Sequence, residues 1–415
     1  MVDDLDALLP EMEEYVRYID SGHARPGVRA VTRLYGRIIP LLPKPHIIPD
    51  PCDILLLSPS PSWARRMEPL EAALRARGVS FRHVVRPTQR AIIRNRLYAP
   101  STMHIPHRWR YLAGYAERLL ATYRPRVIVQ FTDSDPLSYF IALSSRLRGI
   151  RTVNISHAVL VPHVLKSMFC FDFYFVFGRS SIQGAERSSV RFGSSKLVET
   201  GYLLLDRQLE MPPRSDGNAI LFFSTWLYNT SAGFARAYDS AAMHCFETIA
   251  EWAKKQRRYE LVVRPHPDED PSLVTSRLGH LPNVKILPKS VSMAESLRMT
   301  SAAIGMVTNA SIEAAVANRP FTSVFPAGVW DGHLDLEKYY GRRATNADEL
   351  SMKLDRQFEY FDSALDGCHA YAKHHLAYTF DSMDVVTNCL VQIKDDREDF
   401  QSRFLPSVLA GMRRF

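Results

Sequence analysis

The feature that most constrains the fold is an alternation of short apolar runs with amphipathic helical patterns, which occurs in two series along the chain. In the first series, runs such as DILLLS and VIVQF are short and mostly apolar, as strands buried on both faces are. The expected strands cover 53–58, 79–85, 127–131, 152–155 and 173–177, and the expected helices cover 67–77, 111–123 and 137–147. Such alternation is typical of a parallel sheet with helices on both faces.

The second series follows the segment MPPRSDGN at 211–218, whose prolines, glycine and polar residues predict a linker. Its expected strands cover 220–224, 261–263, 284–287, 302–306 and 321–325, and its expected helices cover 234–252, 293–299 and 311–317. The sequence therefore predicts an α/β protein with two Rossmann-like domains, over 51–210 and 218–395, and a cleft between them.

Both ends of the chain are expected to be helical. Residues 1–50 carry apolar residues at helical spacing that prolines interrupt, which predicts a helical N-terminal extension. The chain is mostly helical from about 346, and an apolar stripe with neighbouring arginines predicts an amphipathic C-terminal helix over 396–415. Two roles fit that helix: docking on the first domain, or contact with a membrane surface.

The length and the cysteines bear on the class of protein and its compartment. A chain of 415 residues suits two or three domains. Its five cysteines are scattered without CxxC pairs, which favours reduced thiols in the cytosol over a disulfide framework or a zinc site. The N-terminus MVDDLDALLPEMEEY is acidic, so we expect no signal peptide. The sequence has no run of about 18 apolar residues, so we expect no membrane-spanning helix.

The net charge of +8 is unevenly distributed. Two basic clusters stand out, formed by Arg25, Arg29, Arg33 and Arg37 and by Arg86, Arg90, Arg94, Arg96, Arg108 and Arg110. Such clusters attract anionic partners, namely nucleic acid, an acidic membrane surface or an anionic glycan, unless they only form a solvated face. No zinc finger, RNP pattern or basic zipper is present, so we do not expect nucleic acid to be the partner.

The stretch YELVVRPHPDEDP, residues 259–271, is the most informative for function. Pro265 ends an apolar strand, so Arg264 and His266 are expected at its carboxyl end. Ligands bind at that end in open α/β sheets, and an arginine with a histidine there suits a phosphate. The alternative is that His266 only satisfies a hydrogen bond within the loop.

Other loops at expected strand ends carry polar residues. Ser224 and Thr225 follow the first strand of the second series, and a loop of polar and small residues leads into the helix expected at 311–317. This second loop contributes Thr308, Asn309, Ser311 and Glu313. Free N–H groups at a helix start can bind an anion, although a serine there is often only an N-cap and a glutamate only complements the helix dipole.

The runs VIVQF, NISHA, FDFYFVFG, ETGYLLLD, ILFFSTW, LVVRPHPDED and TNASIEAAVANRP, taken in order, resemble the GT-B-fold transferases of bacterial surface polymers. The resemblance spans about 125–350 and is to the CDP-glycerol glycerophosphotransferase group and to capsule polysaccharide glycosyltransferases. It implies that RPHP and the SIEAA loop bind the phosphate and ribose of the donor, and that His157 faces the acceptor as general base. Asp133 and Asp135 in FTDSDP are alternative bases, as in sialyltransferase-type enzymes.

The sequence departs from that family pattern at two places. His157-Ala158 stands where the family commonly has His-Gly, and Asn318-Arg319-Pro320 stands where it has Gly-Lys-Pro. The first departure concerns the shape of the loop that carries the expected base.

These observations predict a metal-independent glycosyltransferase without a cofactor, whose donor is a CMP, CDP or UDP type. The expected acceptor is a glycan or lipid-linked glycan, and the expected location is the cytoplasm, with a peripheral position at the inner face of the plasma membrane as a further candidate. A glycerophosphotransferase or a UDP-N-acetylglucosamine 2-epimerase-type isomerase is the alternative activity.

Overall fold

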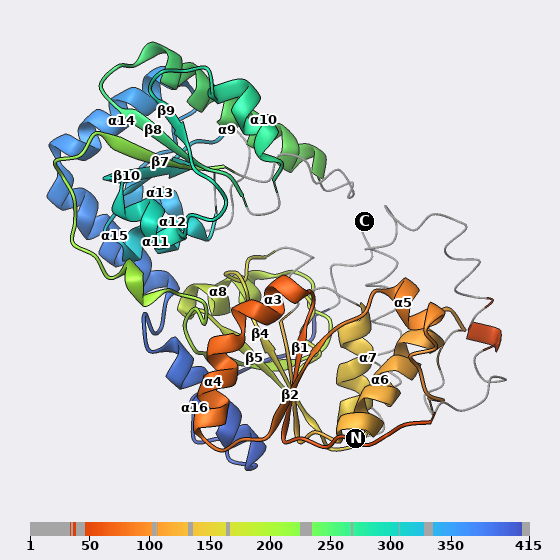
Figure 1. Ribbon diagram of the computed structural model, residues 1–415. Coiled ribbons are helices and arrows are strands. Elements are labelled where there is room, and N and C mark those ends of the chain that lie inside the picture. The colour runs from red at the N-terminus through yellow and green to blue at the C-terminus, as the bar shows by residue number, and fades with distance from the viewer. Residues whose placement is uncertain are drawn as a thin grey trace. The chain divides into compact units, whose positions relative to one another are not determined.

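The computed structural model describes residues 46–408 except for 102–104, 106, 132–135, 163–166, 225–234, 267–268, 307 and 328–334, together with Leu34 and 36–38. The chain divides into two compact units (Figure 1). The first unit combines Met1–Leu204 with Asp381–Phe415, and the second is Leu205–Phe380. The predicted N-terminal extension over 1–50 lies almost wholly outside the described residues.

The first unit is built on a seven-stranded sheet with the order β12-β6-β5-β4-β3-β1-β2. All neighbouring strands are parallel except β12, which pairs antiparallel with β6. The strands are β1 (Ile54–Ser58), β2 (Phe81–Val85), β3 (Val127–Gln130), β4 (Arg151–Ile155), β5 (Phe173–Val176), β6 (Ser195–Glu199) and β12 (Arg403–Leu405).

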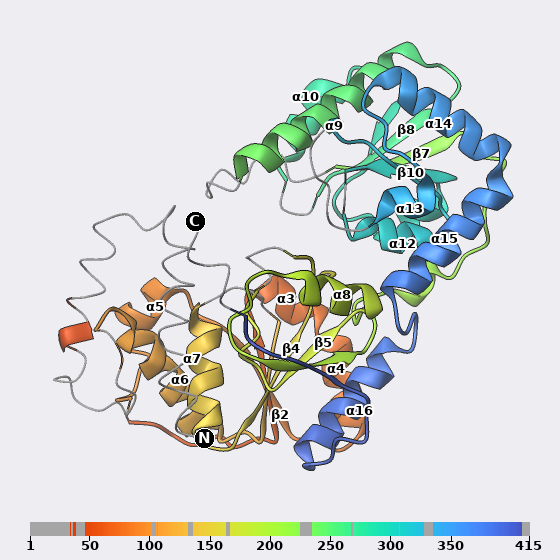
Figure 2. The same ribbon diagram turned by 180° about the vertical axis from the view of Figure 1, so that it is seen from behind.

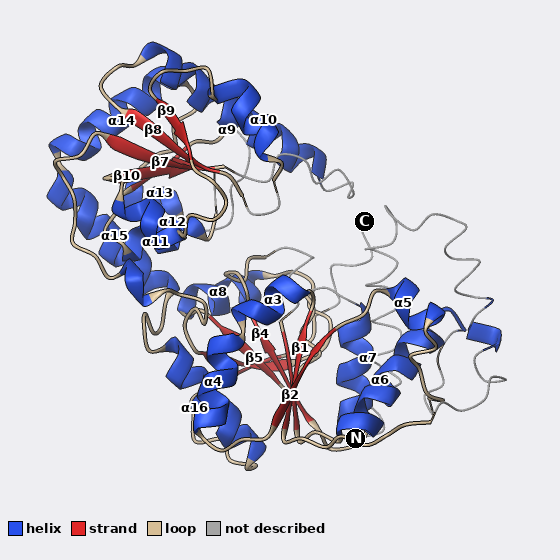
Figure 3. Cartoon of the chain, viewed as in Figure 1, coloured by secondary structure: helices blue, strands red, loops and turns tan. Residues whose placement is uncertain are grey.

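Helices cover both faces of this sheet because successive residues of its inner strands point to opposite sides (Figure 3). Leu55 and Leu57 join one apolar core with α6 and α7, whereas Ile54 and Leu56 join another with α4 and α16. The helices are α3 (Pro61–Arg66), α4 (Glu68–Ala76), α5 (Gln89–Arg94), η2 (His107–Trp109), α6 (Arg110–Tyr123), α7 (Pro136–Arg146), α8 (Arg179–Arg187) and α16 (Ser382–Lys394).

The second unit repeats the design with five parallel strands in the order β11-β10-β7-β8-β9. They are β7 (Ala219–Phe223), β8 (Glu260–Arg264), β9 (Val284–Ile286), β10 (Ala302–Gly305) and β11 (Phe321–Ser323). The helices are η4 (Arg207–Leu209), α9 (Ala235–Lys255), α10 (Pro271–Leu278), α11 (Met293–Arg298), α12 (Ala310–Val316), α13 (Leu336–Tyr340), α14 (Ala347–Glu359) and α15 (Phe361–His375). Two parallel α/β units confirm the predicted fold class.

The predicted C-terminal helix over 396–415 is wrong where the structure describes it. Arg403–Leu405 instead form β12, with Phe404 64% exposed and Leu405 3% exposed. Leu405 joins the apolar core of the unit, and pairing with β6 covers an otherwise open sheet edge. The docking role on the first domain is therefore filled by a strand, and residues 409–415 lie outside the described part.

The domain boundaries also differ from the expected ones. The second unit begins at Leu205, so the predicted linker over 211–218 lies inside it, and it ends at Phe380 instead of 395. Residues 381–395 belong to the first unit because α16 packs beside α4, as the front and back views both show (Figures 1 and 2). Val386 and Leu390 of α16 are buried in the core that also contains Leu70 and Leu74 of α4. Within the described residues, no helix is both long and apolar enough to cross a bilayer.

Candidate functional site

The strand order of the second unit marks one place at the carboxyl edge of its sheet. From β7 the chain moves outward through β8 and β9, and then returns to the other side of β7 as β10 and β11. Ligands of doubly wound sheets bind at such a reversal, outside the carboxyl ends of the central strands. The register places Phe223 of β7 beside Arg264 of β8 and Gly305 of β10, so the loops after all three strands leave one edge together.

A buried carboxylate connects two of these loops. Glu269 is 2% exposed, and its Oε2 accepts hydrogen bonds from the Ser224 hydroxyl and, at 3.2 Å, from the backbone N–H of His266. The Glu269 N–H in turn donates to the His266 carbonyl oxygen at 3.0 Å, and the Ser224 N–H donates to the Arg264 carbonyl oxygen at 3.1 Å. His266 is thereby held at the edge by protein contacts on both sides of the loop.

Glu269 was not among the candidate residues, because nothing in the run PDED distinguishes a buried glutamate from a solvated one. Asp270 and Glu269 of that run have separate roles in the structure. Asp270 caps α10 by accepting from the Ser272 N–H at 3.0 Å, whereas Glu269 turns inward. Of the neighbouring predicted site residues, Thr225 lies outside the described residues.

The guanidinium of Arg264 is half-buried and bonded within the unit. Its Nη1 donates to the Val291 carbonyl oxygen and, at 3.1 Å, to the Ser296 hydroxyl, which ties the end of β8 to α11. Burial lowers the pKa of Arg264, and the negative charges of Glu313 and Glu295 oppose that shift. The charges of Arg264 and Glu313, both predicted site residues, therefore interact.

The loop before α12 satisfies its own donors. The N–H groups of Ala310, Ser311 and Ile312 donate to Thr308 Oγ1, to the Thr308 carbonyl and to the Asn309 carbonyl respectively. The Ser311 hydroxyl, which is buried, donates to the Thr308 carbonyl at 2.6 Å and lies 2.8 Å from the Tyr371 hydroxyl. These contacts occupy the groups that the sequence suggested for an anion, and the N-cap of α12 is Asn309 instead of Ser311.

Donor binding by Thr308, Asn309, Ser311 and Glu313 remains a prediction. The structure places all four after β10 at the same sheet edge as Ser224 and His266. Thr308, Asn309 and Glu313 are partly exposed. Ser311 is fully buried, so its hydroxyl shapes the loop from inside.

Asn318 explains one departure from the family pattern. Its φ of 55° lies in the left-handed region, where the family's glycine is favoured and asparagine is the best-tolerated side chain. The Asn318 side chain donates from Nδ2 to the Met211 carbonyl at 2.8 Å, and its Oδ1 lies 3.0 Å from His369 Nε2. The asparagine therefore keeps the turn after α12 and adds a connection to residues 211–212.

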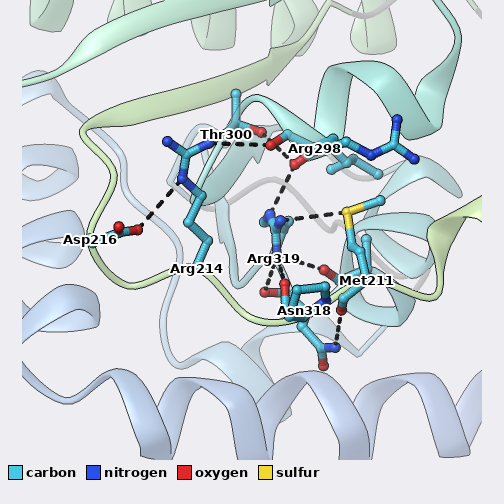
Figure 4. Close-up of polar contacts among 10 residues, drawn as sticks. Met211, Arg214, Asp216, Arg298, Thr300, Asn318 and Arg319 are labelled. Carbon is cyan, nitrogen blue, oxygen red and sulfur yellow. Dashed lines mark hydrogen bonds and ion pairs between the residues drawn. The ribbon is translucent and has the colours of Figure 1, made fainter.

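Arg319 reinforces that connection (Figure 4). It is 2% exposed, and its guanidinium donates to the carbonyl oxygens of Leu297 and Pro212, both at 2.9 Å, and contacts Met211 Sδ at 3.5 Å. Burial, together with the charge of Arg214, lowers its pKa to about 10. Its contacts anchor the segment at 211–212 to α11.

A cavity of about 550 Å³ lies beside this anchored segment, away from the carboxyl edge. Its walls include Met211, Asn318, His369, Lys373 and Phe380. It therefore does not coincide with the loops that carry Ser224 and His266.

In the first unit, His157 follows β4 in a tight turn. The Ser156 hydroxyl donates to the Ala158 carbonyl, and its N–H donates to the Phe175 carbonyl at 2.9 Å. Ala158 is not among the described residues with positive φ, so the family's glycine is not required for this turn. The His157 ring lies nearly perpendicular to the Trp63 ring, with ring centroids 5.6 Å apart. Asp133 and Asp135, the alternative bases, lie outside the described residues.

A chain of hydrogen bonds in the same unit imitates a hydrolytic triad. Ser58 Oγ lies 2.7 Å from His83 Nε2, and His83 Nδ1 lies 2.6 Å from Glu71 Oε1. Ser58 is 0% exposed, so its hydroxyl is closed to a substrate. These hydrogen bonds therefore connect β1, β2 and α4. In the described part of the protein, no cluster of three or more His, Cys, Asp or Glu side chains could hold a metal ion.

No known protein family and no curated protein matches the sequence. Solved structures match the fold. They include UDP-GlcNAc 2-epimerase from Neisseria meningitidis bound to UDP-GlcNAc (TM-score 0.54, 12% identity, 82% of this chain and 100% of that one). MurG from Acinetobacter baumannii matches with a TM-score of 0.52, 13% identity, and coverage of 82% and 100%. MnaA from S. aureus with UDP matches with a TM-score of 0.53, 10% identity, and coverage of 83% and 97%. The likeness shows the GT-B fold.

Proposed function

We propose that this chain is a glycosyltransferase that transfers a sugar from a nucleotide-activated donor to a growing bacterial surface polysaccharide. The observation that carries the proposal is the hydrogen-bonded connection among Ser224, Glu269 and His266 at the strand reversal of the second sheet. It keeps an imidazole at the edge where such sheets bind nucleotides. A buried carboxylate that holds this loop is consistent with a loop whose position matters for a ligand.

The proposed mechanism divides the work between two sets of residues. An acceptor hydroxyl is a weak nucleophile, so a base removes its proton as the bond to the donor sugar breaks. His157 is our candidate, with Asp133 and Asp135 as alternatives. The departing nucleotide keeps the bonding electron pair and gains negative charge on its phosphate, which His266 and the charge of Arg264 stabilise. Thr308, Asn309 and Glu313 are proposed to contact the ribose and phosphates. The scheme uses no metal ion or cofactor.

Binding of nucleotides tests the donor half of this proposal. A ligand that binds the native state raises the unfolding temperature with its occupancy. We expect CMP, CDP, UDP or GDP at millimolar concentration to stabilise the chain selectively, and His266→Ala to lose that stabilisation while unfolding at its usual temperature without ligand. His280→Ala, which removes an exposed imidazole on the same unit, is the matched control. Equal stabilisation of wild type and His266→Ala would refute the assignment of His266.

Two other activities share this fold. Selective stabilisation by CDP, together with transfer of glycerol phosphate from CDP-glycerol, would favour a glycerophosphotransferase. A UDP-GlcNAc 2-epimerase is supported by the similarity to the Neisseria meningitidis enzyme bound to UDP-GlcNAc. Incubation with UDP-GlcNAc alone distinguishes that case, because an epimerase forms the 2-epimer without an acceptor, whereas a transferase leaves the sugar unchanged.

We also propose a cytoplasmic location at an anionic membrane surface, with a glycan or lipid-linked acceptor. Exposed arginines on and after α5, at Arg90, Arg94 and Arg96, support this surface. Vesicle flotation at low and high salt tests it, since electrostatic attachment weakens as ionic strength rises.

A further inference from the structure

The first sheet has its own strand reversal, and aromatic side chains gather there. The chain runs from β1 outward to β2 and then returns to the other side of β1 as β3, β4, β5 and β6. The crevice position is therefore at the carboxyl ends of β1 and β3. Trp63 in α3 follows β1, Phe131 follows β3 directly, and His157 follows β4.

These three rings contact one another. Trp63 stacks on Phe131 with a centroid distance of 6.4 Å and an interplanar angle of 23°. The His157 ring lies nearly perpendicular to that of Trp63, with a centroid distance of 5.6 Å and an interplanar angle of 81°. Phe131 is 2% exposed and supports the indole from the core, whereas Trp63 itself keeps part of its surface exposed.

The indole is fixed in place by local structure. The Ser60 hydroxyl caps α3 by accepting a hydrogen bond from the backbone N–H of Trp63 at 3.4 Å. The Trp63 side chain packs at the margin of the core that contains Leu56 and Val129. A rigid, partly exposed aromatic face loses little conformational freedom when a ligand covers it. Beside a histidine at a strand reversal, such a face suits a flat apolar ligand surface with polar edges.

A charged group lies over the same ring. The Arg66 guanidinium carbon is 5.5 Å from the centroid of Trp63, and the Arg66 side chain is exposed. A cation–π contact at an exposed position is weak, so a ligand can displace the guanidinium from the indole while remaining within its reach. The ligand that these groups fit has a pyranose ring, whose C–H face covers the indole, and an anionic substituent that the arginine pairs with.

We propose that Trp63 is the stacking platform for a sugar ring of the acceptor, and that Arg66 selects a ring bearing a carboxylate or phosphate. The inference rests on the proposed function, because it assigns the acceptor of the same transfer to an acidic glycan. Trp63 and Arg66 act in binding and specificity, while proton removal is left to the base of the proposed mechanism.

Direct binding to the full chain tests the platform. Surfaces coated with a neutral tetrasaccharide (chitotetraose) and with two acidic ones (tetrameric sialic acid and a hyaluronan tetrasaccharide) provide the probes. We expect wild-type protein to bind at least one acidic probe at least tenfold more tightly than the neutral one. Trp63→Ala should weaken that binding at least tenfold, and Trp63→Phe should stay within about threefold of wild type because it keeps an aromatic face.

Variants of the arginines separate charge from stacking. Arg66→Gln should reduce the preference for the acidic probe to less than threefold, whereas Arg65→Gln, an exposed arginine of the same helix, should leave it unchanged. If Trp63→Ala unfolds at a lower temperature than wild type, its weaker binding could reflect a damaged fold. The binding of Trp63→Phe and Arg66→Gln then tests the inference. Wild-type affinity in Trp63→Ala, equal affinity for all probes, or nucleotide stabilisation without binding of any probe would overturn the inference. Probe binding that depends on Trp63 without any nucleotide stabilisation would instead overturn the proposed donor.

Discussion

The hydroxyl of Ser224 donates a hydrogen bond to the carboxylate of Glu269, although the two residues lie in loops that follow different strands. Glu269 also accepts from the His266 N–H, so a single side chain fixes the loop after β7 against the loop after β8. Because the carboxylate is buried, its loss leaves donors without an acceptor in a place that water reaches poorly.

Glu269→Ala is therefore expected to destabilise the second unit by about 2–6 kcal/mol, since two donors lose their acceptor and each unsatisfied buried donor costs about 1–3 kcal/mol. Urea unfolding measures the loss, and the same variant should lose nucleotide stabilisation because His266 is released. Glu269→Gln, which keeps one acceptor oxygen, should lose less. Glu260→Ala removes an exposed glutamate at the start of β8 and should match wild type. An unchanged unfolding midpoint in Glu269→Ala would show that the connection is dispensable.

The base in the first unit is distinguished by kinetics. If His157 removes the acceptor proton, His157→Ala should lower kcat by about 10²–10⁴, the usual contribution of general base catalysis. Asp133→Asn and Asp135→Asn test the alternatives, and His46→Ala, an exposed histidine of the same unit, is the control. The variant whose pH–rate profile loses its acidic limb identifies the base. A full acidic limb in all three variants would exclude each of them.

Arg319 should stabilise the second unit through its carbonyl contacts. Arg319→Met removes the donors to Leu297 and Pro212. We expect the free energy of unfolding to fall by about 2 kcal/mol, because the loss of hydrogen bonds from a charged group outweighs the gain from no longer burying that charge. Arg319→Lys keeps the charge but loses the planar fork, so an intermediate loss is expected. Arg298→Met is the control, since the Arg298 side chain is exposed. A stabilised Arg319→Met would mean that the cost of burying the charge dominates.

The cysteines give a prediction that depends on pH. All five are buried and free. Burial raises the pKa of Cys52 and Cys389 to about 11 and of Cys170 and Cys368 to about 12, and it also raises the pKa of Cys245. At pH 8 a thiol reagent should therefore label the cysteines of the native chain slowly, because the thiolate is the reactive form. After denaturation the reagent should label all five cysteines. Rapid labelling of the native chain would contradict this burial.

The same shifts affect stability at high pH. Below pH 9 the thiols are protonated in both states and contribute nothing. Above the ordinary thiol pKa of 9.0, unfolded thiols release protons that the folded ones retain, so the free energy of unfolding should fall as pH rises from 9 to about 11. Replacing Cys52 and Cys389 with alanine should reduce the part of this slope that they cause, measured by urea unfolding at pH 8 and 10.

Among the described strands, β6 and β12 are the two that the sequence did not predict. Runs such as 127–131 and 173–177 can only be buried, so β3 and β5 were predicted. β6 begins with Ser195, whose buried hydroxyl donates to the carbonyls of Phe169 and Phe171 at 2.7 Å. A serine satisfied by contacts 24 and 26 residues away in the chain carries no local signal of burial.

The sequence predicts where the candidate site residues lie in the fold, but not which residues they contact. Strand ends fixed where Ser224, Arg264, His266 and Thr308 would lie, because parallel strands share one carboxyl edge. The partners of these residues come from distant segments, such as Ser296 for Arg264 and Tyr371 for Ser311. No periodicity encodes such pairs, which is also why Glu269 was overlooked.

The return of residues 381–408 to the first unit has a consequence for biosynthesis. The second unit is inserted between two parts of the first, so a ribosome finishes it before α16 and β12 emerge. Until then the nascent first unit exposes the α4 side of its core and the open edge of β6, where Leu405 and its strand later pack. The first unit can therefore complete its sheet and its α4-side core only after the second unit has been synthesised.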